Sequence, residues 1–172
     1  IYTNTVGRGA QLMLGLAPDN TGQLPLADVK RLNEFGAALH RIYGHNLVPE
    51  QGHAVGAEAA AEHEALDNNP DTFWVAPPLH GTLEVRFDKP VTFDRAVTME
   101  RLNEGQHVED YAVEAWQNGR WKPLVRAHAI GHKKIDIFPS CTAQRIRLNL
   151  ISTSGTAAIR EFQIFNGNSD SG

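Results

Sequence analysis

The stretch Arg145-Ile-Arg-Leu-Asn-Leu150 alternates strictly between polar and apolar side chains. Successive side chains of a β-strand point to opposite faces, so this period of two predicts a strand with one buried face and one solvated face. The apolar face would hold Ile146, Leu148 and Leu150. Arg145 and Arg147 would lie on the polar face, which is either plainly solvated or docks on a larger partner.

Short stretches with the same alternation lie on both sides of that strand. They include Leu83–Phe87 and Tyr111–Ala115, and Phe162 and Ile164 end the series. The tripeptide Gln117-Asn-Gly119 indicates a hairpin, because Asn and Gly tolerate the left-handed backbone of a tight turn. Strands at a spacing of roughly 8–12 residues predict an antiparallel β-sandwich or barrel, here over residues 65–166, followed by a disordered tail at 167–172.

A different pattern occupies residues 1–44. The segment Ala10–Pro18 predicts a buried strand, and the turn Asp19–Gly22 leads from it into a helix. Apolar residues recur every three or four positions of that helix and form one stripe, made of Val29, Leu32, Phe35, Leu39 and Ile42. A strand, a loop and a helix in this order suggest the last structural unit of a larger domain. We therefore expect that Ile1 lies within a longer protein. Residues 45–64 lack periodicity and are expected to be a linker.

Composition restricts the classes of partner. The formal net charge is −4 and no block of Lys and Arg occurs, which argues against nucleic acid as a partner. No apolar run approaches the roughly 20 residues that span a bilayer, so no membrane partner is expected. Cys141 is the one cysteine, so the cellular compartment stays open. The eight His do not form a metal-binding pair at helical spacing.

Several motifs resemble those of discoidin-like domains, which include the coagulation-factor type C and family-32 carbohydrate-binding folds. Asp67-Asn-Asn-Pro-Asp-Thr-Phe-Trp74 resembles their D-G-x-x-x-T-x-W opening, and Gly105–Tyr111, Trp116–Trp121 and Ile159–Ile164 fit the same domain. The resemblance implies a mainly β chain with a discoidin-like (galactose-binding-like) antiparallel β-sandwich.

Residues 1–44 are similar to the end of the catalytic barrel in family-29 α-L-fucosidases, on the evidence of Val6–Asp19, Leu24-Pro25 and Val29–Leu32. Ala129–Ile135 resembles a segment of the discoidin domain attached to those enzymes. The resemblance implies the last strand and helix of a (β/α) barrel, within the C-terminal portion of a retaining exo-α-L-fucosidase that is secreted or periplasmic. In that family both catalytic carboxylates lie upstream, so no catalytic residue is expected here. The missing barrel, in the same or a separate chain, would be the protein partner.

This sequence departs from the family pattern at Gly15, a position at which the end of the fucosidase barrel usually has Asn. Any role of that Asn at the top of the last barrel strand is therefore lost here or taken by another group.

The resemblance further implies a structural Ca²⁺ ion near the discoidin opening. Matched by motif, Asp67 and Thr72 would supply side-chain oxygens, Asn69 a carbonyl and Glu161 the closing carboxylate. Ca²⁺ takes 6–8 oxygen ligands, many of them from carbonyl groups. The alternative is a simple Asx turn with Glu161 exposed to solvent.

Sugar binding is the most frequent activity of such domains and would make fucosylated glycans or other sugars the ligand. It needs an aromatic face and a few polar groups. The loop residues that offer them are Trp74, Arg101, Asn103, His107 and His132, together with His80 and Lys133. Glu100 and Gly105 stand where sugar-binding relatives have Arg and Asn. This departure favours a purely structural β-domain over the other alternative, a stand-alone carbohydrate-binding module. The Trp residues could equally be core or edge aromatics.

Overall fold

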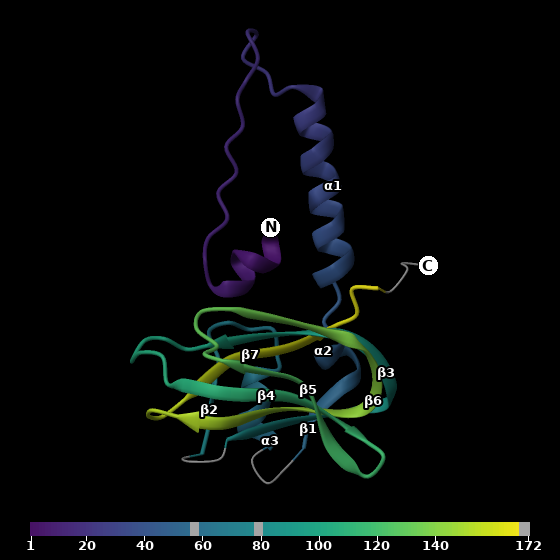
Figure 1. Cartoon of the computed structure of the whole chain (residues 1–172), viewed down its shortest axis with the longest axis vertical. Helices are drawn as coiled ribbons and strands as arrows, with labels where there is room; N and C mark the ends of the chain where they lie inside the picture. Colours follow the sequence, from purple (N-terminus) through teal and green to yellow (C-terminus); the bar gives the residue numbers. More distant parts are fainter. Residues whose placement is uncertain (56–58, 78–80, 169–172) are drawn as a thin grey trace.

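A computed structural model describes residues 1–55, 59–77 and 81–168. One antiparallel sheet folds over on itself to enclose a core, and residues 1–44 rise from one end of it (Figure 1). Its strands follow the order β2-β7-β3-β6-β4-β5, with β1 paired to β3. They are β1 Gly52–Ala54, β2 Trp74–Val75, β3 Thr82–Glu100, β4 Val108–Gln117, β5 Arg120–His128, β6 Lys134–Thr153 and β7 Ala158–Phe165. The mainly β prediction is confirmed.

The strands β3 and β6 are long enough to take part in both layers of the sandwich. They comprise 19 and 20 residues, and their register shifts between Arg86 and Val91 and again between Phe93 and Arg95. Such irregularities bend a strand, so β3 continues through Asp88-Lys-Pro90. Asp88-Lys-Pro90 therefore lies inside one continuous strand, although a proline commonly ends a strand.

The core between the layers is filled by the residues that the alternation selects. Ile146 and Leu148 are fully buried and Leu150 is 1% exposed, as predicted. They pack with large side chains from every long strand and from β2, among them Trp74, Phe87, Phe93, Tyr111 and Phe162. Burial of each such side chain contributes about 1.5–3 kcal/mol, so this core holds the sandwich together.

The segment predicted as a linker, 45–64, contributes to the sandwich. It contains the short helices α2 Leu47–Gln51 and α3 Ala59–Glu62, followed by the 3-10 turn η3 His63–Ala65. The buried Asn46 side chain accepts from the backbone N–H of Val48, in the first turn of α2, and from that of Ile164 in β7. One side chain thus fixes the helix to the sheet, and a pattern without periodicity does not reveal such a contact.

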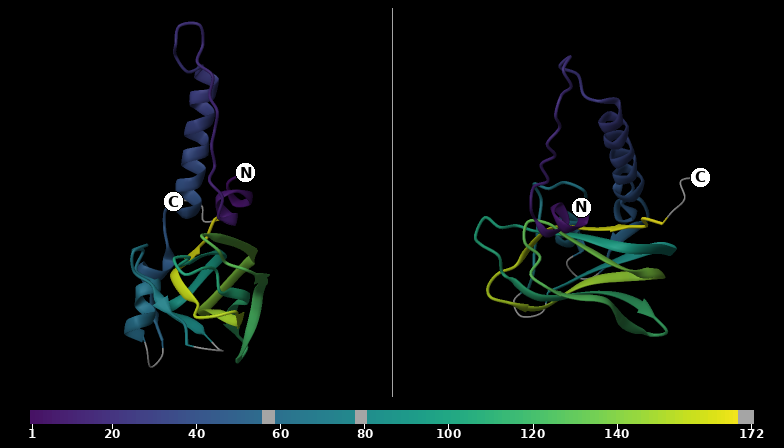
Figure 2. Two further views of the ribbon diagram at one scale, coloured as in Figure 1. Left: turned by 90° about the vertical axis from the view of Figure 1, so that its left-hand side faces the viewer. Right: turned by 45° about the horizontal axis from the view of Figure 1, so that its top comes forward.

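The extension consists of two 3-10 turns, η1 Tyr2–Asn4 and η2 Val6–Arg8, an extended segment, and the helix α1 Leu26–Tyr43 (Figures 1 and 2). The helix confirms the predicted apolar periodicity. The predicted strand at Ala10–Pro18 is not formed, because a strand requires hydrogen bonds to a neighbouring strand and none lies beside it in the described residues. No residue of α1 is buried, although its apolar stripe is present.

The base of the extension rests on one end of the sandwich. Tyr2 and Tyr43 pack on a small apolar cluster of Val97, Ile135 and Phe165. The Arg41 guanidinium donates to the carbonyl of Gly167 at 2.9 Å, and the N–H of Gly167 donates to Asp94. The predicted disordered tail is thus held in place at its start, and residues 169–172 lie outside the described chain. No helix in the described ranges is long and apolar enough to cross a bilayer.

Candidate functional site

The loop that leads into β2 is organised by the carboxylate of Asp67. Its Oδ1 accepts the N–H of Asn69 at 2.8 Å. The Thr72 hydroxyl lies 3.0 Å from Asp67 Oδ2 and 2.7 Å from the Asn69 carbonyl oxygen. Asn68 adopts φ 62°, a left-handed conformation that Asn tolerates better than most residues. Three of the four predicted metal ligands therefore meet in one turn.

Glu161 reaches this turn from β7. Its side chain is 1% exposed, and Oε1 has no hydrogen-bond partner among the described residues. Burial and, to a smaller extent, the nearby Asp67 charge raise the pKa of Glu161 to about 7, while contacts from Gln163 and the Asn68 backbone and the charge of Arg160 act against the rise. The alternative of an exposed Glu161 is therefore wrong, because the sheet covers this carboxylate.

These four residues fit an oxygen-ligated cation. The set offers two carboxylates, a hydroxyl and a backbone carbonyl, which are the donors that Ca²⁺ prefers. A buried oxygen without a donor and a carboxylate with a raised pKa both indicate uncompensated negative charge. Within the described ranges no cluster of three or more His, Cys, Asp or Glu occurs, so a cation here would depend on the hydroxyl and carbonyl oxygens as well.

A polar hollow of about 350 Å³ adjoins the same loop. Two of the predicted sugar-binding residues, Arg101 and Asn103, line it, and the remaining lining residues are Pro70, Asp71, Phe73 and Arg160. The Arg101 guanidinium carbon lies 4.3 Å from the centre of the Phe73 ring. The Arg160 Nε donates to the Pro70 carbonyl at 2.9 Å. The structure thus joins the discoidin opening, the loop after β3, and β7 in one concave surface.

Sequence reasoning missed Phe73 and Arg160 as members of this hollow. Phe73 lies inside the discoidin motif and Arg160 precedes the predicted ligand Glu161, but neither spacing shows that they face Arg101. Strand pairing provides the link, since Glu100 pairs with Ile159 at the ends of β3 and β7.

The other predicted sugar-binding residues lie elsewhere. Trp74 is 1% exposed in the core, so it offers no ring face to a sugar. The His107 ring packs against Gly155, where a Cβ would approach Nδ1 to 2.6 Å. His132 and Lys133 line a different hollow, described below. His80 lies outside the described residues.

Glu100 occupies the position at which the discoidin resemblance implies an Arg. Its side chain is buried, and Oε1 accepts the N–H groups of His107 at 2.7 Å and Val108 at 2.9 Å. Oε2 accepts the N–H of Gly131 at 3.3 Å. A carboxylate with three backbone donors fastens two loops together, and this position has no positive charge to offer a ligand.

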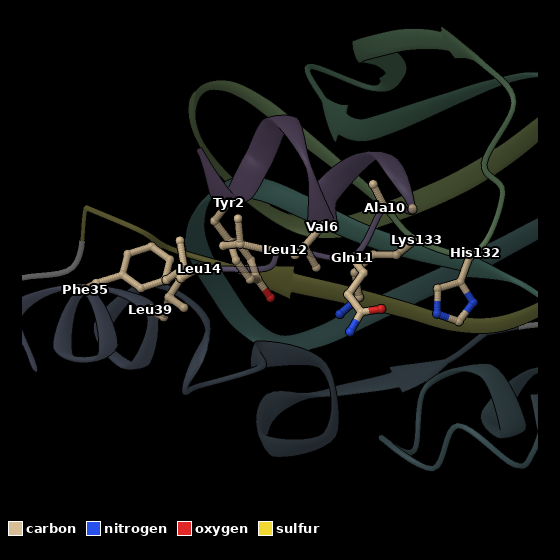
Figure 3. A pocket seen from close by; sticks show the side chains of 11 residues that line it. Tyr2, Val6, Ala10, Gln11, Leu12, Leu14, Phe35, Leu39, His132 and Lys133 are labelled. Carbon is tan, nitrogen blue, oxygen red and sulfur yellow. The ribbon is translucent and has the colours of Figure 1, made fainter. Parts of the chain in front are cut away.

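The second hollow lies between the extension and the sandwich and measures about 600 Å³. Figure 3 shows Leu12 and Leu14 of the extended segment, Phe35 and Leu39 of α1, and His132 and Lys133 at its sides. Burial lowers the pKa of Lys133, whereas the charge of Glu161 acts to raise it. This hollow is a junction lined largely by apolar side chains.

The indole faces of Trp116 and Trp121 are occupied by arginines. The two rings meet edge to face at 5.3 Å, Arg145 lies 4.9 Å from the centre of Trp116, and Arg147 lies 4.4 Å from that of Trp121. The same arginines contact Glu84 and Glu114 at 2.6 Å. This packed ladder explains the polar face of β6.

Comparisons with known proteins agree with the fold and extend to residues 1–44. Residues 51–162 match the F5/8 type C domain family. An α-L-fucosidase 1 of Arabidopsis thaliana is 23% identical over 155 residues, which are 84% of this chain and 31% of that protein. A GH29 fucosidase of Ruminococcus gnavus, solved in complex with fucose, superposes with a TM-score of 0.82 at 26% identity, over 96% of this chain and 35% of its own.

A chitosan-binding module from a Paenibacillus chitosanase/glucanase shares the fold alone, with a TM-score of 0.60 at 16% identity, over 71% of this chain and 98% of the module. The chain spans about a third of the curated relatives it matches, 34% and 31% of their lengths.

Proposed function

Because the chain belongs to the F5/8 type C domain family, and its fucosidase relatives also cover the extension, we propose that it is the C-terminal portion of a retaining exo-α-L-fucosidase. The parent would release terminal α-L-fucose from glycans in a secreted or periplasmic location. In this proposal the sandwich braces the catalytic barrel and contacts the glycan.

The observation that carries this proposal is the unpartnered apolar surface of the extension. Met13 is 84% exposed and Leu26 is 87% exposed, and no residue of the 18-residue helix α1 is buried. Leaving large apolar side chains in water costs about 1.5–3 kcal/mol each relative to burial. A barrel that supplies a strand beside Ala10–Pro18 and helices beside α1 would cover this surface.

The chemistry of hydrolysis would then come from the barrel. A retaining glycosidase uses two carboxyl groups about 5–5.5 Å apart. In the extension, Asp19 is occupied in a turn, where Oδ1 accepts from Thr21 and Gln23 and these bonds lower the pKa of Asp19. Asp28 lies in the first turn of α1, where a negative charge stabilises the helix N-terminus.

The test is to co-produce this chain with the barrel that we propose precedes it. We expect a stoichiometric complex in native mass spectrometry that hydrolyses 4-nitrophenyl α-L-fucoside, whereas the chain alone is inactive. Phe35→Ser should weaken the complex at least tenfold, and Ile151→Ser, at an exposed position of β6, should not. Absence of a complex, or a complex without fucosidase activity, would reject the proposal.

We also propose that Asp67, Asn69, Thr72 and Glu161 hold a structural Ca²⁺ ion. The support is the buried Oε1 of Glu161, which has no hydrogen-bond partner among the described residues, and the interaction of this carboxylate with the nearby Asp67 charge. The ion would neutralise the two carboxylates and stabilise the loop, without a part in the hydrolysis.

Calcium at a hundred times its dissociation constant should raise the free energy of unfolding by about 2.7 kcal/mol over the chain in EDTA. Glu161→Gln should abolish this increase, and the control Glu109→Gln, at an exposed position of β4, should retain it. An unchanged unfolding curve at millimolar Ca²⁺, or a full response in Glu161→Gln, would contradict the site.

A further inference from the structure

Two arginines converge on the 350 Å³ hollow beside the Asp67 turn. Arg101 directly follows β3 and Arg160 lies in β7, and these two strands pair. The N–H of Arg101 donates to the Ala158 carbonyl at 2.8 Å, which continues the ladder beyond the strand end. The sheet itself therefore sets the two side chains next to the same cavity.

Both guanidinium groups are held by contacts that leave hydrogen-bond donors for a ligand. Arg101 stacks on Phe73, and its Nη1 lies 3.8 Å from Glu104, whose side chain is 80% exposed. Arg160 donates its Nε–H to the Pro70 carbonyl, which fixes the position of the guanidinium group and leaves its two terminal nitrogens as donors for a ligand. By contrast, Arg147 of the tryptophan ladder lies 2.6 Å from a carboxylate.

The charges and the aromatic contact both favour one class of ligand. Two guanidinium groups and one carboxylate, Asp71, line the hollow, so its lining carries one positive charge in excess, while the Glu104 carboxylate beside Arg101 is mostly exposed to solvent. Arg101 covers one face of the Phe73 ring, so that face cannot stack on the apolar side of a neutral sugar. A guanidinium fork matches a carboxylate or sulfate with two parallel hydrogen bonds.

We propose that this hollow binds an anionic sugar, one that carries a carboxylate or a sulfate group. Arg101 and Arg160 would hold the anionic group, while Asn103 and Asp71 would contact ring hydroxyls. The volume of about 350 Å³ is at the small end for ligand pockets and suits one monosaccharide. The inference rests on the proposed contact of the sandwich with glycan, and it does not depend on fucosidase activity.

The test uses the full chain, labelled with ¹⁵N, and three probes with the same galactose ring: methyl galacturonoside, galactose 6-sulfate and methyl galactoside. We expect the two acidic probes to shift the amide signals of residues 101–103 and 159–161 at millimolar concentration, and the neutral probe to shift none. If only one of the two acidic probes binds, the proposal holds and the anionic group of the natural ligand is the one which that probe carries. Raised salt should weaken the binding, as expected for a charged contact.

Variants identify the groups responsible. Arg101→Gln and Arg160→Gln should each weaken binding of the acidic probe at least about tenfold. Arg101→Lys keeps the charge without the fork and should retain intermediate affinity at an unchanged melting temperature, which separates binding from folding. Arg126→Gln removes an exposed arginine of β5 and should bind as the native chain does.

Equal binding of all three probes, binding of none, or an equal loss in Arg126→Gln and Arg101→Gln would overturn the proposal. These outcomes are read from binding alone. A complex with the barrel that lacks fucosidase activity would reject the parent function and leave the anionic site standing.

Discussion

Removal of one hydroxyl group should expose the cost of a buried carboxylate in the sandwich. Tyr111 is fully buried, Asp136 is 6% exposed, and the Tyr111 hydroxyl donates to Asp136 Oδ2 at 2.6 Å. Burial raises the pKa of Asp136 above its ordinary value of 3.8, although this hydrogen bond and the charges of Lys134 and Arg8 oppose the rise. Tyr111→Phe keeps the ring and removes only the donor.

The magnitude follows from the charge state of Asp136. Because its folded pKa lies above the unfolded value, its contribution to stability is fully present below the unfolded pKa and is lost as the pH rises through the folded pKa. Tyr111→Phe raises the folded pKa further. We therefore expect the substitution to cost about 1 kcal/mol near pH 4, as for a neutral hydrogen bond, and about 2–3 kcal/mol near pH 8, as for a charged one.

The assay is urea unfolding followed by tryptophan fluorescence at both pH values. Asp136→Asn should be as stable as the native chain near pH 8, or more so, because the amide oxygen still accepts from Tyr111 without a buried charge. Asp88→Asn is the matched control, since the Asp88 side chain is 82% exposed. If Tyr111→Phe lowers the free energy of unfolding equally at both pH values, the hypothesis that the Tyr111 hydroxyl stabilises a buried, charged Asp136 is wrong.

Three other substitutions test the seat of the extension, the loops held by Glu100, and the tryptophan ladder. Gly7→Ala places a Cβ 2.9 Å from Ile135 side-chain carbons, so it should lower the free energy of unfolding by about 1–3 kcal/mol, and an unchanged urea midpoint would contradict this seat of the extension. Glu100→Gln removes the negative charge that accepts from three backbone N–H groups and should lower the free energy of unfolding by about 1–2 kcal/mol. Hydrogen exchange at those three amides should become faster, and unchanged exchange would contradict this role of Glu100. Arg147→Lys loses the stack on Trp121 and should cost about 0.5–1 kcal/mol with altered tryptophan emission, whereas identical emission would argue against the stack.

Local patterns predicted those parts of the fold that depend on one face of one element. The alternation at Arg145–Leu150 identified a buried and a polar face, and the stripe on Val29–Ile42 identified a helix. The discoidin motif brought Asp67 and Thr72 into contact because both lie in one short turn. These features need only neighbours within a few residues of chain.

The rest depends on contacts between distant segments. The bend that carries β3 through Asp88-Lys-Pro90 is set by its register with β6, and no local signal reports that register. The discoidin motif is compatible with Trp74 as a sugar-binding aromatic and with Trp74 as a core residue. Only the packing of the sandwich shows that it is buried. Arg160 and Arg101 are 59 positions apart in the sequence, and only the pairing of β3 with β7 brings them together.

The predicted strand at Ala10–Pro18 is instructive because the pattern and the structure disagree there. The segment has the apolar composition of a buried strand, yet Leu14 is 49% exposed and Leu16 is 40% exposed. The opposite helix α1 has an apolar stripe and no buried residue. Apolar patterning indicates which surfaces pack against a partner, whereas a strand also needs a neighbouring strand for its backbone hydrogen bonds. Within the described residues, Ala10–Pro18 has no strand to pair with and α1 has no buried side chain. One further body that covers both elements would explain the two observations, and this is the role we propose for the barrel.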